Sequence, residues 1–307
     1  MEHNLSVKTD YISAFGNQHD GVIEIVGIVP GGVIEVGYFY GDAKPKNIVD
    51  ISTQVGCPMS CSFCELGSER FVRNLTAQEI ADQVTLMLDI AQKHGIDTAR
   101  VPHKVTIAKT GEPLLNPHVR EGLERIATLS QSFKISTVYP HNCHERLKEI
   151  ADFASHYQRT VQLQISLIST SEEYRRKTAG KGVAGFEEIR AGAHYWREKN
   201  PTGRKINLSL ILTEDVPCDV RSVRHIFPPE LFRFRFRNYV PTTNGTSAGL
   251  HTLPQQKFEQ ILEEFRTVGY DVNEAATPTP TELKFGLAAN VTRRRYLEMT
   301  GQTVRDV

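Results

Sequence analysis

The chain has 307 residues, which allows one large domain or two small ones. It contains 36 Lys and Arg against 36 Asp and Glu, so the formal net charge is zero and a broadly basic surface that grips a phosphate backbone is disfavoured. A composition with 39% hydrophobic and 23% charged residues is typical of a soluble globular protein and excludes disordered and collagen-like classes.

The N-terminal part carries no recognisable targeting or membrane segment. No basic start is followed by an apolar run, so no secretory signal is predicted. The charge-free stretch 25–34 is half the length of a membrane span and contains Pro30. We therefore expect a cytoplasmic protein with no membrane partner.

Taken in chain order, the elements begin with a polar lead over residues 1–20, expected to be irregular or a short helix. A β-hairpin is predicted over 22–40, because two Val- and Ile-rich arms flank a Pro-Gly-Gly turn. From residue 48 onward strands and helices alternate, which predicts βα units and a parallel sheet. The six predicted strands are 48–54, 104–108, 133–138, 161–168, 205–212 and 231–240.

The faces of these strands indicate the architecture. In 161–167 apolar side chains alternate with Gln162, Gln164 and Ser166, and in 232–237 Phe alternates with Arg. A parallel sheet covered by helices on both faces reads as continuous apolar runs, and these strands do not. We therefore predict helices on one face only, as in a partial (β/α)6 barrel with a polar lumen and an N-terminal β-hairpin extension. An open doubly wound sheet with wet edges is the alternative.

The predicted organisation has three parts. Residues 1–45 form the lead and the hairpin extension, 46–275 form the barrel, and 276–307 form a C-terminal cover segment and helix. Within the last part, 276–280 is Pro-rich and is read as a turn, and the run 292–295 is read as a basic, solvated helix face.

Three of the five cysteines, Cys57, Cys61 and Cys64, share one short loop with C-x3-C-x2-C spacing. Structural zinc takes four ligands, so a zinc site here would need a distant fourth one. A cubane iron–sulfur cluster also takes four ligands. Three thiolates on a loop after the first barrel strand would leave one iron open to a non-protein ligand, at the end where βα enzymes carry their active sites.

This spacing, with Phe63 directly before the last cysteine, resembles the signature of the radical S-adenosylmethionine (SAM) superfamily. The segments STQVGC (52–57), FVRNL (71–75) and GEPLLN (111–116) resemble the subgroup that methylates adenine in ribosomal and transfer RNA. The resemblance runs from about Gly21 to residue 300. It implies a 4Fe–4S cluster whose open iron binds SAM, and a 5′-deoxyadenosyl radical formed by one-electron cleavage of SAM.

Site residues follow from this resemblance, residue by residue. Cys57, Cys61 and Cys64 would hold the cluster. The SAM-binding residues implied are Phe63 behind the adenine, Gly111 and Glu112 at the methionine amino group, Ser136 and Ser166 at the ribose or carboxylate, and Thr243 and Asn244 near the adenine.

The chain departs from that subgroup at its two additional cysteines. The one that removes a substrate proton corresponds to Asp50, and the methyl-carrying one corresponds to Phe285, which has no lone pair to carry a methyl group. A methyl-cysteine route would then need Cys143 or Cys218. Few residues precede the hairpin where the subgroup has an RNA-binding domain, so an RNA partner is disfavoured.

The lumen predicts an anionic substrate. Asp50 and Lys109 are candidate proton-transfer residues, and the substrate-binding candidates on the last predicted strand are Arg233, Arg235 and Arg237. Buried charges need partners, so either these lumen charges neutralise one another or an anionic ligand does so. The hypothesis is a substrate that carries a carboxylate or phosphate held by some of these cations.

Three functions remain open at this stage. The first is a biosynthetic radical-SAM enzyme that acts on a small anionic metabolite or nucleotide by hydrogen abstraction or radical addition, with flavodoxin or ferredoxin as electron donor. The second is an RNA-modifying radical-SAM enzyme without methyl-cysteine. The third is a non-catalytic iron–sulfur or SAM-sensing protein.

Overall fold

The structure, a computed structural model, describes residues 5–17, 19–41, 46–99, 102–180, 182–275 and 292–301. The segment 276–280 and Phe285 lie outside these residues. The strands are β1 (Lys8–Asn17), β2 (Asp20–Val29), β3 (Gly32–Gly41), β4 (Lys46–Ile51), β5 (Gln54–Val55), β6 (Arg73–Asn74), β7 (Lys104–Ile107), β8 (Ser132–Thr137), β9 (Thr160–Ile168), β10 (Ile206–Leu212), β11 (Phe232–Asn238) and β12 (Val272–Glu274). The helices are α1 (Ala77–Lys93), α2 (Val119–Ile126), α3 (His144–His156), α4 (Glu172–Ala179), α5 (Phe186–Lys199), α6 (Val220–Val223), α7 (Thr243–Ser247), α8 (Gln255–Thr267), α10 (Thr292–Met299) and the short 3-10 helices η1 (Glu65–Ser68) and η2 (Pro113–Leu115).

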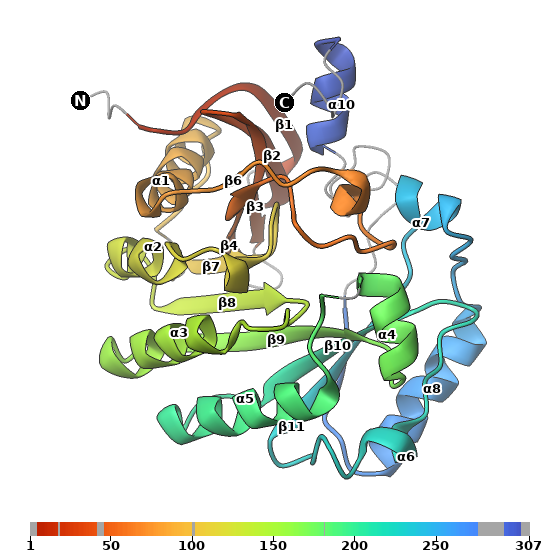
Figure 1. Ribbon diagram of the computed structural model, residues 1–307. Coiled ribbons are helices and arrows are strands. Elements are labelled where there is room, and N and C mark those ends of the chain that lie inside the picture. Colours follow the sequence, from red (N-terminus) through yellow and green to blue (C-terminus); the bar gives the residue numbers. More distant parts are fainter. Residues whose placement is uncertain are drawn as a thin grey trace.

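One large sheet organises the chain in the order β1-β2-β3-β4-β7-β8-β9-β10-β11-β12. The six strands from β4 to β11 in this order are parallel to their neighbours and correspond to the six predicted strands. Helices α1, α2, α3 and α5 lie along one side of the sheet (Figure 1). This arrangement confirms the predicted partial (β/α)6 barrel.

The two faces of the barrel strands differ as their alternation predicts. On the helix side, Phe133 and Ile135 of β8 and Phe234 of β11 are fully buried in the main core. On the other side, Lys134 and Arg235 are only half-buried. Because the helices remove one face from water and leave the other partly hydrated, polar residues persist along the inner face at every second position.

The N-terminal extension is a three-stranded antiparallel sheet on the edge of the barrel. The predicted hairpin is present as β2 and β3 around Pro30 and Gly31. The expected irregular or helical lead is wrong, because β1 pairs along β2. Its polar, weakly alternating sequence gives little strand signal. The strand pairs with β2, and its Tyr11 ring packs edge-on against Tyr296 of α10 at 5.9 Å between centroids.

The terminal helix α10 packs on this extension rather than presenting a solvated basic face. Leu297 joins Val26 and Val33 in a small apolar cluster, which corrects the reading of 292–295. Arg293 is only 2% exposed, and its guanidinium donates to the Val33 carbonyl at 2.7 Å. The burial of Arg293 could not be expected from the sequence, because Glu69, whose carboxylate pairs with the guanidinium, lies far away along the chain.

A buried ion pair joins the extension to the barrel. Lys109, two residues after the end of β7, contacts Glu24 of β2 at 2.6 Å, with side-chain exposures of 5% and 0%. Burial by itself would lower the pKa of Lys109, but the carboxylates of Glu24, Glu35 and Asp50 raise it above its usual value. Lys109 is therefore a fixed cation in the fold.

No helix in the described ranges is both long and apolar enough to cross a membrane.

We predict that Lys109→Met lowers the free energy of unfolding by about 3–5 kcal/mol at pH 8, because it leaves Glu24 buried without its cation. Burial raises the pKa of Glu24 above its usual value, so the folded variant takes up a proton at a higher pH than the unfolded chain does. The loss should therefore shrink as the pH falls toward 5. Urea unfolding at both pH values measures this. The control Lys257→Met, at an exposed position of α8, should change little, and a loss at pH 8 as small as the control's would contradict the prediction.

Candidate active site

The three clustered cysteines lie on the loop that follows β5, above the carboxyl ends of the barrel strands. All three are free, with Cys61 buried and Cys57 and Cys64 half-buried. They pack with Met59 and Phe63 in a small apolar cluster separate from the main core. Gly56 initiates the loop at φ +70°, where an added Cβ would lie 2.0 Å from the Arg70 carbonyl oxygen. Glycine is therefore required where the loop leaves the strand.

Segments distant in sequence hold this loop from two sides. On one side, the Ser62 amide donates to the Thr178 carbonyl at 2.8 Å, at the end of α4. On the other, the Asn244 side-chain amide of α7 donates to the Cys64 carbonyl at 2.8 Å, and the Thr242 hydroxyl donates to the Phe63 carbonyl at 3.2 Å. The loop is consequently positioned by the βα segments around it.

The donor set fits an iron–sulfur cluster better than a single metal ion. Among the residues described, no three His, Cys, Asp or Glu side chains converge on a point that could hold one ion. Zinc would require such convergence, with each ligand about 2.0–2.3 Å away. Thiolates spread over one loop suit a cubane, in which each binds a separate iron. Burial raises the pKa of Cys57 to about 12 and that of Cys64 to about 11, so cluster binding must displace thiol protons.

Gly111 and Glu112 are held by β5, the strand that precedes the cysteine loop, and by the end of β8. Gly111 has φ +105°, and a Cβ there would meet the Gln54 side chain at 2.6 Å. The Gln54 side-chain oxygen in turn accepts from the Glu112 amide at 2.8 Å. Glu112 is buried, and its carboxylate accepts from the Thr137 hydroxyl at 2.5 Å and from the Val138 amide at 2.9 Å. Burial raises the pKa of Glu112 to about 7, although these hydrogen bonds act to lower it.

The predicted SAM contacts on the strands point to the same side of the sheet. Ser136 of β8 and Ser166 of β9 are half-buried on the inner face. The Ser136 hydroxyl accepts from the Gln164 side chain at 3.4 Å. Ile168, which ends β9, has φ +72°, an outlier for a β-branched residue, and it packs with Cys61. The carboxyl ends of β8 and β9 are thus near the cysteine loop. Thr243, another predicted SAM contact, lies on α7 and donates its backbone amide to the Glu65 carboxylate at 2.7 Å.

The inner face carries more cations than the sequence reading identified. Arg233, Arg235 and Arg237 lie on it as predicted, and Lys104 and Lys134 join them. The alternation of β8 would have identified Lys134, which shares a face with Ser136. None of these five cations forms an ion pair with a carboxylate in the described ranges, and Arg233 Nε is buried without a hydrogen-bond partner.

Asp50 is an acid on the inner face that interacts electrostatically with Lys104 and Lys134. It lies on β4 opposite Thr106, and Thr106 lies opposite Lys134 on the next strand. Its Oδ1 atom is buried with no hydrogen-bond partner. Burial raises the pKa of Asp50, while Lys109 and Lys134 pull it down. Burial also lowers the pKa of Lys134 to about 8, since the attraction of Asp50 does not offset desolvation and the neighbouring cations.

The other two cysteines lie in different surroundings. Cys143 precedes α3 and is buried in the main core, and Cys218 is half-buried against that core near Asp219 and Glu264. Neither belongs to the apolar cluster that contains the cysteine loop.

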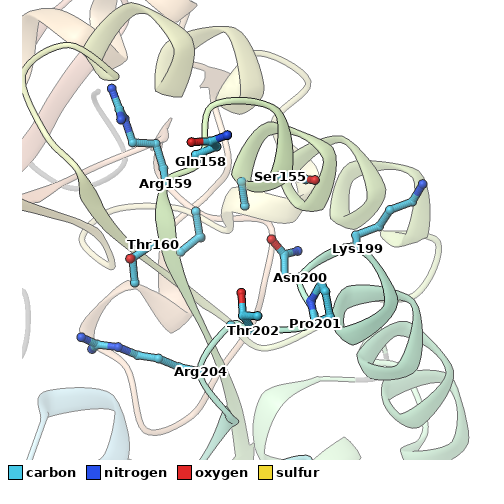
Figure 2. Close-up of a pocket in the computed structure, with 12 residues that line it drawn as sticks. Ser155, Gln158, Arg159, Thr160, Lys199, Asn200, Pro201, Thr202 and Arg204 are labelled. Atoms are coloured by element: carbon cyan, nitrogen blue, oxygen red, sulfur yellow. The ribbon is translucent and has the colours of Figure 1, made fainter.

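A separate cavity of about 480 Å³ opens at the opposite end of the barrel, where β9 begins and α3 and α5 end. Figure 2 shows Arg159, Lys199 and Arg204 around it. Arg159 is already engaged, donating twice to the Ala127 carbonyl. Because enzyme sites in βα barrels lie at the carboxyl ends of the strands, this cavity is not the candidate active site.

Comparisons with known proteins agree with this geometry. The family model described as the radical SAM superfamily matches residues 51–221. One relative is a Clostridium perfringens (strain 13) protein named "probable dual-specificity RNA methyltransferase RlmN". It is 29% identical to this chain over 307 residues, which cover 95% of this chain and 80% of the relative. A Symbiobacterium thermophilum protein of the same name is 31% identical over 230 residues, covering 71% of this chain and 58% of the relative.

A solved structure shares the fold. A radical SAM methyltransferase from Sphaerobacter thermophilus superposes with a TM-score of 0.71 at 17% identity, covering 90% of this chain and 78% of that one. The family match covers more than half of the chain and spans the cysteine loop, the Gly111–Glu112 pair and strands β7 to β10. The chain therefore belongs to the radical SAM superfamily and is a radical-SAM enzyme.

Proposed function

We propose that this enzyme cleaves SAM reductively and acts on a small anionic substrate, a metabolite or nucleotide carrying a carboxylate or phosphate, bound in the barrel lumen. When bound through Cys57, Cys61 and Cys64, the 4Fe–4S cluster and SAM supply a 5′-deoxyadenosyl radical that abstracts hydrogen from a substrate or adds to it. The proposed electron donor is a flavodoxin or ferredoxin.

The observation that carries the choice of substrate is the unpaired set of lumen cations. Removing charges from water without partners costs several kcal/mol each. Lys134 and Arg235 are half-buried, Asp50 lies on the same face as Lys134 without forming an ion pair with it, and the neutral side chain of Gln164 lies 3.5 Å from Arg235. A dianionic group would neutralise these cations through charge-assisted hydrogen bonds. It would lie below the strand ends, with the rest of the substrate directed toward the cysteine loop.

The residues proposed to bind SAM are Phe63, Gly111, Glu112, Ser136 and Ser166. Their shared position at the carboxyl ends of the strands supports this role. Glu112 suits an ammonium group, because it is a buried carboxylate held rigidly by Thr137 and Val138.

Thr243 and Asn244 were expected near the adenine of SAM. Their hydrogen bonds to Glu65 and to the Cys64 carbonyl favour a role in holding the cysteine loop. The adenine contact therefore stays a prediction.

Asp50 is the proposed proton-transfer residue. Its buried, unpartnered oxygen lies on the same face as Lys134, and burial raises the pKa of Asp50, which makes its carboxylate a stronger base. Lys109 is a weaker candidate, since its ion pair with Glu24 raises its pKa and keeps the proton in place.

The proposal also includes the division of the chain into an N-terminal extension (1–45), the barrel (46–275) and a C-terminal cover segment (276–307).

A second candidate function is RNA modification without methyl-cysteine. The relatives named RNA methyltransferases favour it. The lumen cations would then bind a backbone phosphate next to an extruded base. Asp50 stands at the position of one subgroup cysteine, so the proton-removal step would use a carboxylate in place of a thiolate.

We predict that anaerobically reconstituted enzyme with dithionite and SAM produces 5′-deoxyadenosine, because three thiolates leave one iron for SAM. Cys57→Ala, Cys61→Ala and Cys64→Ala should each abolish the product, which chromatography detects. The matched control Cys218→Ala, in the half-buried core position, should retain it. A wild-type enzyme with a full cluster and no 5′-deoxyadenosine would support the sensor alternative.

We predict that sulfate, a dianion that does not titrate near neutral pH, binds the lumen cations. Lys134→Gln and Arg235→Gln should each weaken sulfate affinity by about tenfold at pH 7, as expected for loss of a charge-assisted hydrogen bond. Because the pKa of Lys134 is about 8, wild-type affinity should fall between pH 7 and pH 9, and Lys134→Gln should lose this dependence. Calorimetry at constant ionic strength measures both. Equal affinities in the lumen variants and in the surface control Arg266→Gln would exclude the anion site.

RNA binding separates the two candidate functions. With transfer RNA and ribosomal RNA fragments as probes, we expect complexes at low salt that dissociate at physiological salt, because the net charge is zero. Mass analysis of the RNA after incubation with methyl-deuterated SAM should show no label. Tight binding at physiological salt together with a labelled adenine would establish the RNA-modifying function instead.

A further inference from the structure

The segment directly after the cysteine loop is tied to the far end of the chain. This segment, η1 with the following Glu69, begins one residue after Cys64. Its acidic side chains Glu65 and Glu69 are 6% and 7% exposed. Figure 1 shows α10 next to the strands of the N-terminal extension, and its arginines reach both acids.

Arg293 connects three parts of the molecule. Its backbone amide donates to the Glu35 carboxylate of β3 at 2.9 Å, and its Nε donates to the Val33 carbonyl. Its Nη1 pairs with Glu69, and both side chains are nearly inaccessible to solvent. The cation is thus anchored on β3 and presented to the segment that follows the cysteines.

Arg294 makes the neighbouring connection. Its Nη1 contacts the Glu65 carboxylate at 2.8 Å and the Thr243 hydroxyl of α7. The other Glu65 oxygen accepts from the Thr243 amide at 2.7 Å. Asn244, the next residue of α7, donates to the Cys64 carbonyl. Glu65 therefore receives hydrogen bonds from α10 and α7 together, one residue from Cys64.

We propose that Arg293 and Arg294 are positioning residues for the cluster-binding loop, so that α10 determines how firmly the enzyme retains its iron–sulfur cluster. The physical reason is both geometric and electrostatic. Without the arginines, two buried carboxylates would lie next to three cysteine thiolates, and η1 would lose its attachment to β3. This role does not depend on which substrate the lumen takes.

The test uses the full-length reconstituted enzyme and follows loss of the cluster's visible absorbance in the presence of an iron chelator. Arg294→Gln, a half-buried position, should lose the cluster about fivefold to tenfold faster than wild type, and Arg294→Lys should restore part of the retention because it keeps the charge. Arg266 pairs with Glu263 of its own helix α8, so the control Arg266→Gln should match wild type.

Hydrogen exchange of the cluster-free protein supplies a second readout. Amides of the cysteine loop and η1 should exchange faster in Arg294→Gln, whereas amides of β8 and β9 should not change. Glu65→Gln should act like Arg294→Gln, and the double variant should be no worse than either, since both remove one interaction. Cluster loss and loop exchange at wild-type rates in Arg294→Gln would overturn the proposal. This outcome is independent of whether the enzyme forms 5′-deoxyadenosine, which tests the proposed function instead.

Discussion

The site depends on hydrogen bonds that reach the cysteine loop from segments distant in sequence. The loop leaves the barrel at Gly56 and has only short-range turns of its own, such as the Cys64 amide to the Cys61 carbonyl. Its position comes from Thr178 at the end of α4 and from Asn244 in α7. A loop that must keep three thiolates at fixed positions around one cluster cannot tolerate independent motion, so its neighbours determine its geometry.

The motifs around the loop have structural as well as binding roles. The Ser52 hydroxyl accepts from the Thr110 amide and donates to the Glu35 carbonyl, which joins the first barrel strand to the next and to the extension. The Asn116 side chain donates to the Thr53 and Leu75 carbonyls. Family motifs such as STQVGC and GEPLLN therefore reflect a hydrogen-bonded framework that keeps Glu112 beside the cluster loop. The same residues serve the fold and the site.

The outer face of the barrel sheet forms the apolar core, and the inner face carries the charged side chains of the lumen. Phe232, Phe234 and Phe236 are buried under the helices, while the arginines between them face the lumen. Burial in apolar surroundings stabilises the barrel. Because successive side chains of a strand point to opposite faces of the sheet, the arginines face the lumen and do not enter the apolar core. Charge that would destabilise a closed core is thus placed where a ligand can neutralise it.

Much of this protein could be predicted from local patterns. The six parallel strands, the hairpin at Pro30 and the cysteine spacing depend on neighbours in sequence, and the structure shows the strands and the hairpin as predicted. The lumen-facing arginines followed from the strict alternation of β11.

Other features were decided only by tertiary structure, because their partners lie far away in the sequence. The strand β1 forms on β2 and α10, and Lys109 is fixed by Glu24 on the extension. Arg293 is buried although a run of three arginines usually faces water, since Glu69 pairs with its guanidinium and Glu35 accepts from its backbone amide. Local sequence fixes the period of a strand or a helix, whereas the burial of a charge depends on which distant group the fold brings to meet it.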